Sequence, residues 1–472
     1  MGTELILDSC GLSENNNKEK SSKTKPFTRQ KPLLPKIESY SVDLITNEDS
    51  RYNGLRKGFN KSIDKYPAVI ALCTNTKDVA EAISYANKNN LEIAIKSGGH
   101  NVEGFSVNDG GMVINLSKMN SVEFLEGNKL KIGPGCTIAQ LYAEILPKNR
   151  IIPVGSCGSV AMGGLTMGGG YGLFSREYGL ICDQLLEATF VDGNAATHST
   201  KDDPELLWAL RGGGSGNFGV VTEMIFQMHK APAGIQVHYF KALNLGADRA
   251  KNILEYWFEF TSLLPNLCFS GFVLNGKTLN IIVMNHERKT PAFQNLLNTL
   301  GEVMDKSYPG RYRELSAMMK NYYGLPTPAN FKISSAGFYK NYGEISECIL
   351  PVLEIVINTK GMIYQVNTFG GNINNPIFEK GSCFPHRAMN YISELQSYWE
   401  VTAQEQKLKA ATSEILEILI KNGITAQYVN YCNADFEEWE IAYYGTNYKR
   451  LQAVKKKYDV TNNVRHPQSI KV

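Results

Sequence analysis

A histidine and a cysteine, each in a glycine turn, are the residues of this sequence best suited to form a bond to a ligand. His100 lies in the run Lys96-Ser97-Gly98-Gly99-His100-Asn101, and Cys157 follows 57 residues later in Gly155-Ser156-Cys157-Gly158-Ser159-Val160. A neutral imidazole nitrogen and a thiolate are both good nucleophiles. Glycine turns expose backbone N–H groups that bind anions such as phosphate. Taken singly, each residue also has a simpler interpretation, as a surface histidine in a turn and as a small buried cysteine.

The cysteine opens the most glycine-rich stretch of the chain, residues 155–179, in which nine of 25 residues are glycine. A flexible linker of this composition would lack large apolar residues. Here Val160, Met167, Tyr171 and other apolar residues lie between the glycines. Glycine permits positive φ and a close approach of backbone to a ligand. The stretch therefore predicts packed backbone beside something large and flat.

A second glycine motif, Gly214-Ser-Gly-Asn-Phe-Gly219, matches the GxGxxG pattern of dinucleotide-binding proteins. That pattern requires a strand before it and a helix after it. Here a predicted helix, 204–211, precedes the motif and a predicted strand, 220–226, follows it. We therefore reject a nicotinamide dinucleotide site and predict a glycine loop that approaches a ligand or another chain segment.

The elements around His100 place it at a typical ligand position. Residues 67–72 form an apolar run that predicts a buried strand, and a helix is predicted from Thr76 because apolar residues recur at helical spacing. Residues 91–95 predict a second strand, which runs directly into the histidine turn. Ligands favour the loop after such a strand in a βαβ unit.

The rest of the chain divides by composition. Residues 1–45 are largely polar and predict a disordered leader, whereas 46–235 form a first folded domain. Residues 236–425 mix strand-like and helix-like runs, which predicts an antiparallel sheet with helices, and 426–472 are rich in aromatic residues. The predicted elements beyond those above are strands at 111–116, 130–133, 271–274, 279–284 and 362–368, and helices at 138–146, 251–264, 293–304 and 410–421.

Composition excludes several classes of protein. With 43% hydrophobic and 20% charged residues the chain is an ordinary globular protein, and its net charge of +3 gives no basis for a nucleic-acid or membrane partner. The nine cysteines are odd in number and form no CxxC pair, so we predict no metal site and no full disulfide framework. Their spacing fits a reducing compartment or a few unassigned bridges. Because no signal peptide is evident, we expect a cytoplasmic protein.

Taken together, SGGHN, GSCGSV and AMGGLTMGGGYGLFSREYG resemble the FAD-linked oxidases of the berberine bridge enzyme type, within the vanillyl-alcohol oxidase and p-cresol methylhydroxylase superfamily. The resemblance covers residues 60–235 and 426–470, and the middle matches loosely. It implies an α+β fold: a PCMH-type FAD-binding domain of two subdomains at 46–235, a substrate domain with an antiparallel sheet backed by helices at 236–425, and a segment, 426–472, that returns to the FAD-binding domain.

The resemblance also implies covalent FAD. In members with two bonds, a histidine binds the flavin 8α-methyl carbon and a cysteine binds C6; His100 and Cys157 occupy these places, although members with one bond leave the cysteine link open. The implied cofactor-binding residues are Lys96, Ser97, Gly98, Gly99, His100, Asn101, Gly155, Ser156, Cys157, Val160, Gly163, Gly164, Gly168, Gly169, Tyr171, Gly172, Gly219, Val220, Val221, Asn430 and Tyr431.

The run Tyr428-Val429-Asn430-Tyr431 resembles the YxNY element of the family. In relatives that act on sugars its second tyrosine is the general base, so Tyr431 inherits that role. A phenol has a pKa near 10 and needs help to act near neutrality. Some relatives supply an aspartate where this chain has Asn367, which cannot accept a proton. Tyr364 and Gln365 are fallback candidates to assist Tyr431, although packing within a strand is their simpler interpretation. His386 is interpreted as a structural residue that could also reach the site.

The leading function is an oxidase that takes a hydride from an alcohol, a sugar or a secondary metabolite and uses O₂ to give H₂O₂. Val160 lies three positions after Cys157. In relatives, a small side chain at that position is typical of oxidases, because it leaves space for O₂ beside the flavin, and a bulkier aliphatic one is typical of dehydrogenases. A dehydrogenase with another electron acceptor and a flavin-binding protein with little turnover are the alternatives. The expected partners are a small-molecule substrate and O₂, and the sequence predicts no oligomeric state.

Overall fold

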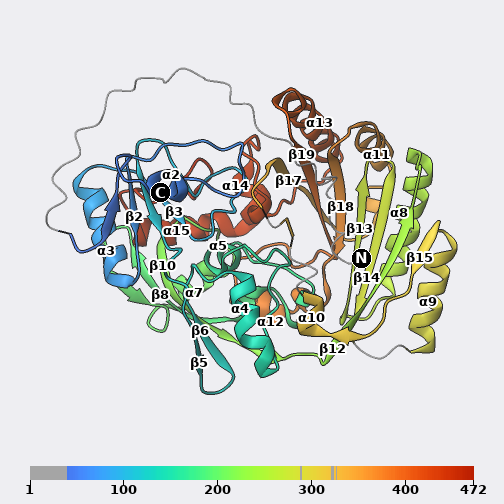
Figure 1. Cartoon of the computed structure of the whole chain (residues 1–472), viewed down its shortest axis with the longest axis horizontal. Helices are drawn as coiled ribbons and strands as arrows, with labels where there is room; N and C mark the ends of the chain where they lie inside the picture. Colours follow the sequence, from blue (N-terminus) through green and yellow to red (C-terminus); the bar gives the residue numbers. More distant parts are fainter. Residues whose placement is uncertain (1–39, 287–289, 320–323, 326) are drawn as a thin grey trace.

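The computed structural model describes residues 40–286, 290–319, 324–325 and 327–472 (Figure 1). Most of the leader predicted over 1–45 therefore lies outside the described residues. Its last part was predicted wrongly, because Asp43–Ile45 form strand β1, which pairs antiparallel with strand β2, Val69–Leu72. Val42 and Ile45 are buried, so the apolar side chains just before residue 46 already belong to the core.

The first sheet contains the predicted βαβ unit. Its strand order is β1-β2-β4-β3, in which β2 and β3 (Ile93–Lys96) each run parallel to β4 (Met112–Asn115). The helix between β2 and β3 is α3, Thr76–Lys88, and it begins where the Asn75 side chain accepts a hydrogen bond from the backbone N–H of Asp78. The predicted strand–helix–strand unit is confirmed, and the observed ends of β2 and β3 lie within two residues of the predicted ends.

A second, antiparallel sheet follows, with strand order β5-β6-β10-β8-β9. Helices and a small two-stranded sheet, β11-β7, connect or flank it. The bounds are β5 Val122–Leu125, β6 Lys129–Ile132, α4 Ile138–Ile145, β7 Arg150–Ile151, α5 Met162–Met167, α6 Ser175–Tyr178, β8 Leu185–Asp192, β9 Thr197–Ser199, α7 Pro204–Leu210, β10 Gly219–Gln227 and β11 His229–Lys230.

The third sheet has eight antiparallel strands in the order β15-β12-β14-β13-β18-β19-β17, with β16 also paired to β12. Helices α8, α9, α11 and α13 lie along its outer side (Figure 1). The bounds are β12 Gly234–Ala242, α8 Ala247–Ser262, β13 Cys268–Asn275, β14 Thr278–Asn285, α9 Pro291–Glu302, β15 Lys306–Tyr308, β16 Arg313–Glu314, α10 Leu315–Met319, β17 Asn330–Tyr339, α11 Ile349–Asn358, β18 Met362–Thr368, α12 Pro376–Gly381, β19 Tyr391–Trp399 and α13 Thr402–Lys421.

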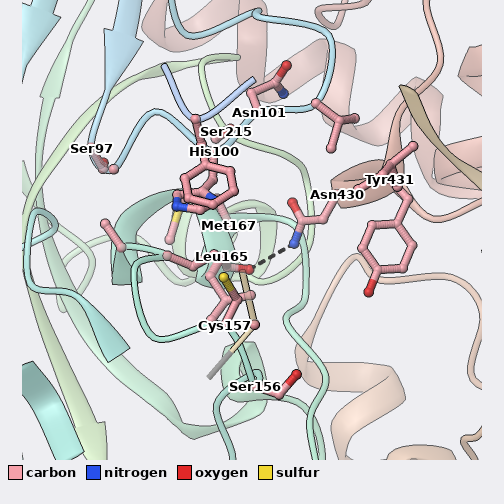
Figure 2. A pocket seen from close by; sticks show the side chains of 18 of the residues that line it. Ser97, His100, Asn101, Ser156, Cys157, Leu165, Met167, Ser215, Asn430 and Tyr431 are labelled. Carbon is pink, nitrogen blue, oxygen red and sulfur yellow. Dashed lines mark hydrogen bonds between the residues drawn. The ribbon is translucent and has the colours of Figure 1, made fainter. Parts of the chain in front are cut away.

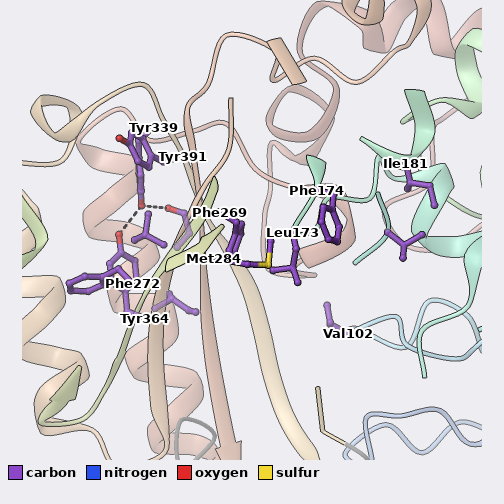
Figure 3. Packing of buried hydrophobic residues seen from close by; sticks show 14 of the residues in the cluster. Val102, Leu173, Phe174, Ile181, Phe269, Phe272, Met284, Tyr339, Tyr364 and Tyr391 are labelled. Atoms are coloured by element: carbon purple, nitrogen blue, oxygen red, sulfur yellow. Dashed lines mark hydrogen bonds between the residues drawn. The ribbon is translucent and has the colours of Figure 1, made fainter. Parts of the chain in front are cut away.

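Alternation along these strands separates the two faces of the third sheet. On the helix side, Tyr364 is fully buried and hydrogen-bonds Tyr339, with 3.1 Å between their hydroxyl oxygens. Figure 3 shows Phe272 and Tyr364 on one side of the sheet and Phe269 and Met284 on the other, toward Leu173. The second face is therefore free to form the wall of a site.

The C-terminal residues 426–472 return to the first two sheets. They form a short turn of 3₁₀ helix, η6 (Val429–Tyr431), and helices α14 (Trp439–Tyr444) and α15 (Tyr448–Tyr458). The Ile93 N–H donates to Asn463 O at 2.9 Å, and the fully buried Lys455 ammonium donates to Asn217 O at 2.6 Å and to Asp459. This return brings Tyr431 to the edge where the sheets meet.

An α+β body joined to an antiparallel sheet backed by helices confirms the predicted fold class. Strands β8, β12, β17 and β19 were not predicted from the sequence. Among the described residues, no helix is long and apolar enough to cross a membrane. Within the same residues, no group of three or more His, Cys, Asp and Glu side chains is placed to hold a metal ion.

A buried ion pair joins the 3₁₀ turn η2 (Ile181–Gln184), which follows the glycine-rich stretch, to the loop before β19. Arg387 donates to both carboxylate oxygens of Asp183, at 2.8 and 2.6 Å, and both side chains are almost completely buried. The Arg387→Met variant should lose about 3–5 kcal/mol of unfolding free energy, because it leaves the Asp183 carboxylate buried without its partner. Urea denaturation measures this loss.

The matched control is Lys421→Ala, which removes an exposed pair with Glu417. Exposed pairs contribute at most about 1 kcal/mol, so its unfolding free energy should barely change. Equal stability of the Arg387→Met variant and the native protein would contradict the structural role of the pair.

Candidate active site

A cavity of about 450 Å³ lies where the first two sheets meet the inner face of the third. Three loops form one wall: the turn after β3, the residues around Cys157, and the glycine loop before β10. Strands β13, β14, β17, β18 and β19 form the opposite wall, and Asn430 and Tyr431 of η6 close one side. Figure 2 shows His100 above Cys157, with Tyr431 across the pocket from both.

The histidine is held as a neutral imidazole. Its ring stacks on Phe59 with 4.1 Å between the ring centroids. Burial lowers the pKa of His100 to about 4, so the ring is uncharged near neutrality. An uncharged imidazole has a free nitrogen lone pair, which is the form that a bond to carbon requires.

The cysteine lies in the same wall. Cys157 is half-buried and unpaired, and its sulfur lies 3.6 Å from Ser159 Oγ. Val160 follows on the cavity wall, where its N–H donates to Cys157 O at 3.1 Å and its carbonyl accepts from the Ile138 N–H at 2.9 Å. These two bonds tie the residues around Cys157 to the start of helix α4.

Glycines shape the wall in a way that fits a large flat cofactor. A Cβ added to Gly164 would meet no atom within 4 Å, so any side chain there would project into the cavity. A Cβ on Gly98 would lie 2.9 Å from Ala161, and one on Gly163 would lie 2.6 Å from Ser97 Oγ. The loops can therefore stay this close to each other, and to a ligand, only with glycine at these positions.

Tyrosines and an asparagine meet on the opposite side of the cavity. The Tyr431 hydroxyl donates to Tyr171 Oη at 3.4 Å, and the Asn367 amide donates to the same oxygen at 2.7 Å. Asn367, which stands where some relatives have an aspartate, is therefore linked to Tyr431 through the Tyr171 hydroxyl. The Asn430 amide donates to Leu165 O at 3.1 Å and to Tyr428 Oη at 3.0 Å, which fixes η6 against the glycine-rich stretch (Figure 2).

A buried carboxyl group, Glu394 on β19, faces the same cavity and was missed in the sequence analysis. It is 6% exposed and lies opposite Gln365 and Ser335 in the strand register. Burial raises the pKa of Glu394 to about 7. Burial, and then the charge of this carboxylate, raise the pKa of Tyr431 well above its ordinary value. At neutral pH Tyr431 is therefore a phenol, whereas the pKa of the Glu394 carboxyl lies close to neutrality.

Carboxamides extend this network along the sheet. Gln365 Nε2 donates to Asn367 Oδ1 at 3.1 Å, and Gln396 Nε2 donates to Gln365 Oε1 at 3.3 Å. At the far end the Tyr398 hydroxyl donates to Gln396 Oε1 at 3.1 Å. Gln365, a fallback candidate, thus lines the cavity in a fixed orientation.

The cavity wall includes most, but not all, of the predicted site residues. Those on the wall are Ser97, Gly98, Gly99, His100, Asn101, Ser156, Cys157, Val160, Gly163, Gly164, Gly219, Val221, Asn367, Asn430 and Tyr431. Lys96 is turned away and donates to Leu55 O and Lys57 O. Tyr171, Gly155 and Val220 do not line the cavity, although the Tyr171 hydroxyl bonds to Asn367 and Tyr431, which do.

Three glycines predicted to touch the cofactor instead allow chain segments to pack together. A Cβ on Gly168 would lie 2.1 Å from Asn430 Oδ1, one on Gly169 2.9 Å from Phe384, and one on Gly172 1.9 Å from Val154 O. Two fallback candidates also lie outside the site. Tyr364 faces the helices, and His386 is buried against Phe338 with a nitrogen 2.9 Å from Gln427 O.

Comparison with known protein families agrees with this geometry. Residues 67–201 match the family described as FAD binding domain, and residues 427–471 match the family described as berberine and berberine like. The two matches cover the loops around His100 and Cys157 and the η6 turn that carries Tyr431.

Individual relatives extend over nearly the whole chain. The FAD-linked oxidoreductase YvdP of Bacillus subtilis is 30% identical over 448 residues, which cover 90% of this chain and 97% of the relative. The chitooligosaccharide oxidase of Gibberella zeae is 28% identical over 451 residues, which cover 88% of this chain and 89% of the relative.

The structure of Physcomitrella patens BBE-like 1 shares the fold, with a TM-score of 0.84 at 21% identity over 91% of this chain and 97% of that one. FAD binding and oxidoreductase chemistry, predicted from the sequence, are thus confirmed by the family matches and by the extent of the YvdP match. This chain belongs to the berberine bridge enzyme-like family of FAD-linked oxidoreductases.

Proposed function

We propose that the chain is an oxidase with covalently bound FAD, which takes a hydride from an alcohol, a sugar or a secondary-metabolite substrate and uses O₂ to give H₂O₂. The observation that carries the proposal is that His100, Cys157, Tyr431 and Glu394 line one cavity. Residues 46–235 and 426–472 hold the cofactor, and residues 236–425 supply the substrate wall. When bound, FAD supplies the two-electron acceptor. The oxidase named among the relatives supports this choice.

His100 and Cys157 are proposed to hold the cofactor. His100 is uncharged and stacked on Phe59, so its lone pair is available and its ring is oriented. Cys157 lies at the cavity surface, where a half-buried thiol stays accessible. Gly98, Gly164 and Gly216 line the cavity without a side chain, so the backbone at these positions can come close to a ligand.

Tyr431 and Glu394 are proposed to handle the substrate proton. Because the Tyr431 phenol keeps its proton at neutral pH, it orients the substrate oxygen or passes a proton on rather than acting as a phenolate. A carboxyl with a pKa of about 7 is suited to general base catalysis near neutrality. We therefore assign the final acceptor role to Glu394 and the contact with substrate to Tyr431.

The first prediction concerns the covalent bonds. Acid precipitation of the purified protein should leave the flavin in the pellet. His100→Ala and Cys157→Ala should each keep one bond and a yellow pellet, whereas the double variant should release FAD into the supernatant. Absorbance of both fractions measures this. Free FAD from the native protein would contradict covalent attachment.

The second prediction concerns Tyr431. The Tyr431→Phe variant keeps the ring and removes only the hydroxyl, so FAD should remain bound. Loss of a proton-handling group slows a reaction by about 10²–10⁴-fold, and anaerobic flavin reduction should slow by a factor in that range. Tyr398→Phe, which removes a hydroxyl at the far end of the carboxamide row, is the matched control and should change the rate little. A native rate in Tyr431→Phe would move the role to another residue.

The third prediction concerns O₂. Val160 lines the cavity beside the Cys157 turn, and close packing in protein interiors means that one added methylene can fill a space the size of O₂. Val160→Ile should slow reoxidation in air by at least about tenfold and leave anaerobic reduction nearly unchanged. Stopped-flow absorbance follows both half-reactions. If the native reduced protein persists for minutes in air-saturated buffer, it is a dehydrogenase and the oxidase assignment is wrong.

A further inference from the structure

The last strand of the third sheet carries a buried ammonium group. Lys332 lies in β17, the strand that ends the order of that sheet, and the residue is buried. Its neighbours Phe331 and Ile333 line the cavity, and because side chains alternate along a strand, Lys332 points away from it. The ammonium therefore acts on other parts of the chain rather than on a ligand in the cavity.

That ammonium bonds to the two chain segments that carry His100 and Tyr431. It donates to Glu103 Oε1 at 2.5 Å, and Glu103 lies three residues after His100. It also donates to Asn433 Oδ1 at 2.8 Å, and Asn433 lies two residues after Tyr431. The loop after β3, the edge of the third sheet and the segment after η6 thus meet at one charge, that of Lys332.

The loop after His100 is fixed by its own hydrogen bonds. Asn101 Oδ1 accepts from the backbone N–H groups of Glu103 and Phe105, at 3.1 and 2.8 Å. Asn101 Nδ2 lies 3.6 Å from the sulfur of Cys432, in the segment after η6. The position of the loop therefore follows that of Glu103.

The segment after η6 is fixed in a similar way at Asn433. Its N–H donates to Tyr443 Oη at 3.0 Å, and its carbonyl accepts from Gln468 Nε2 at 2.7 Å. Its side-chain oxygen also accepts from the Asp435 N–H at 3.0 Å. The Asp435 carboxylate lies 3.4 Å from the ammonium but is 70% exposed, so water weakens that contact. The bond from Lys332 therefore ties this segment to the third sheet.

A neutral side chain could not replace the ammonium. The side chains of Lys332 and Glu103 are 11% and 12% exposed, so little water reaches the pair. An ammonium has three donors, and hydrogen bonds between charged groups are short and strong. Removal of the lysine charge would leave the Glu103 carboxylate buried without a partner. The charge therefore holds all three segments in one arrangement.

We propose that Lys332 is a positioning residue for the reaction: by holding Glu103 and Asn433, it sets the distance between the His100 loop and Tyr431. This inference rests on the proposed function, in which His100 holds FAD and Tyr431 contacts the substrate. A displacement of about 1 Å between reacting groups can slow a reaction by about 10²-fold. Loss of the link should therefore slow flavin reduction more than it weakens substrate binding.

Substitutions at Asn433 cut the link to η6 and leave the Lys332–Glu103 pair whole. Asn433→Leu removes the acceptor at similar volume, whereas Asn433→Asp keeps an acceptor oxygen. Anaerobic stopped-flow experiments use cellobiose and benzyl alcohol as probes. At saturating probe, Asn433→Leu should slow flavin reduction by about 10–100-fold and change the dissociation constant of the probe less than about threefold. Asn433→Asp should restore the rate to within about threefold of the native rate.

A double variant separates positioning from stability. Lys332→Met alone should lower the urea midpoint, because it leaves the Glu103 carboxylate buried without a partner. Lys332→Met combined with Glu103→Gln buries no lone charge, so the midpoint should return toward the native value. Flavin reduction should nevertheless stay at least about tenfold slower than in the native protein, since the link is still missing. The matched control Lys409→Met, which removes an exposed pair with Glu405, should change neither property.

Hydrogen exchange measures how firmly η6 is held without any substrate. In the FAD-loaded protein, amide exchange over residues 428–434, followed by mass spectrometry, should become at least about threefold faster in Asn433→Leu and in the double variant. Exchange over residues 402–421, in the distant helix α13, should stay at the native rate. Acid precipitation should leave as much flavin in the pellet of each variant as in that of the native protein.

Three results would overturn the inference and leave the proposed function in place. They are a reduction rate that recovers together with the urea midpoint in the double variant, an Asn433→Leu variant that binds the probe more weakly but is reduced at the native rate, and native exchange over residues 428–434 in that variant. If neither probe reduces the native flavin, the proposed function fails for sugars and simple alcohols, and the exchange result alone decides the inference.

Discussion

The close packing of the glycine-rich stretch against the loop before β19, the C-terminal segment and residue Val154 is the constraint on which the site depends. At Gly168, Gly169 and Gly172 the neighbouring atoms leave no room for a Cβ. Because the backbone comes this close, Tyr171 reaches Asn367 on β18 and Tyr431 on η6. A larger residue at Gly168 would push against Asn430 of η6 and so disturb that hydrogen-bonded group.

The same packing explains the electrostatics of the site. Once the walls meet, Glu394 is enclosed by phenols, carboxamides and apolar side chains, and burial raises its pKa to about 7. The pKa of Tyr431 is raised, which makes its phenol a poorer base near neutrality, because burial and the Glu394 charge both favour the protonated form. The function proposed above therefore gives the two groups separate roles, with Tyr431 in contact with the substrate and Glu394 as the proton acceptor.

Much of this arrangement could be predicted from the sequence, for identifiable reasons. The βαβ unit up to Lys96 contains an apolar run and a helical period that begins after the Asn75 cap. These local patterns predict its strands and its helix close to their observed bounds. His100, Cys157 and Tyr431 lie in motifs with fixed spacing, and the structure brings all three to one cavity. Local patterns of this kind do not depend on distant parts of the chain.

Other features depend on contacts that a sequence does not reveal. Strand β19 mixes Ser393, Gln396 and Ser397 with apolar residues without a regular period, so nothing local marks the Glu394 carboxyl as buried in a site. Tyr364 and Gln365 are neighbours, and only the helices packed on one face decide that Gln365 lines the cavity. Likewise, a glycine that accommodates a ligand and a glycine that accommodates Phe384 look the same in sequence.

The central claim is that Glu394 accepts the substrate proton in the cavity that holds FAD. The most direct measurement is the rate of anaerobic flavin reduction as a function of pH, in the native protein and in Glu394→Gln. The carboxyl must be ionised to accept a proton, so the native rate should rise with pH and level off above a midpoint near 7. The variant should be slower and should lack this midpoint. A native rate that does not change between pH 5 and 9, or a midpoint that persists in Glu394→Gln, would contradict the account.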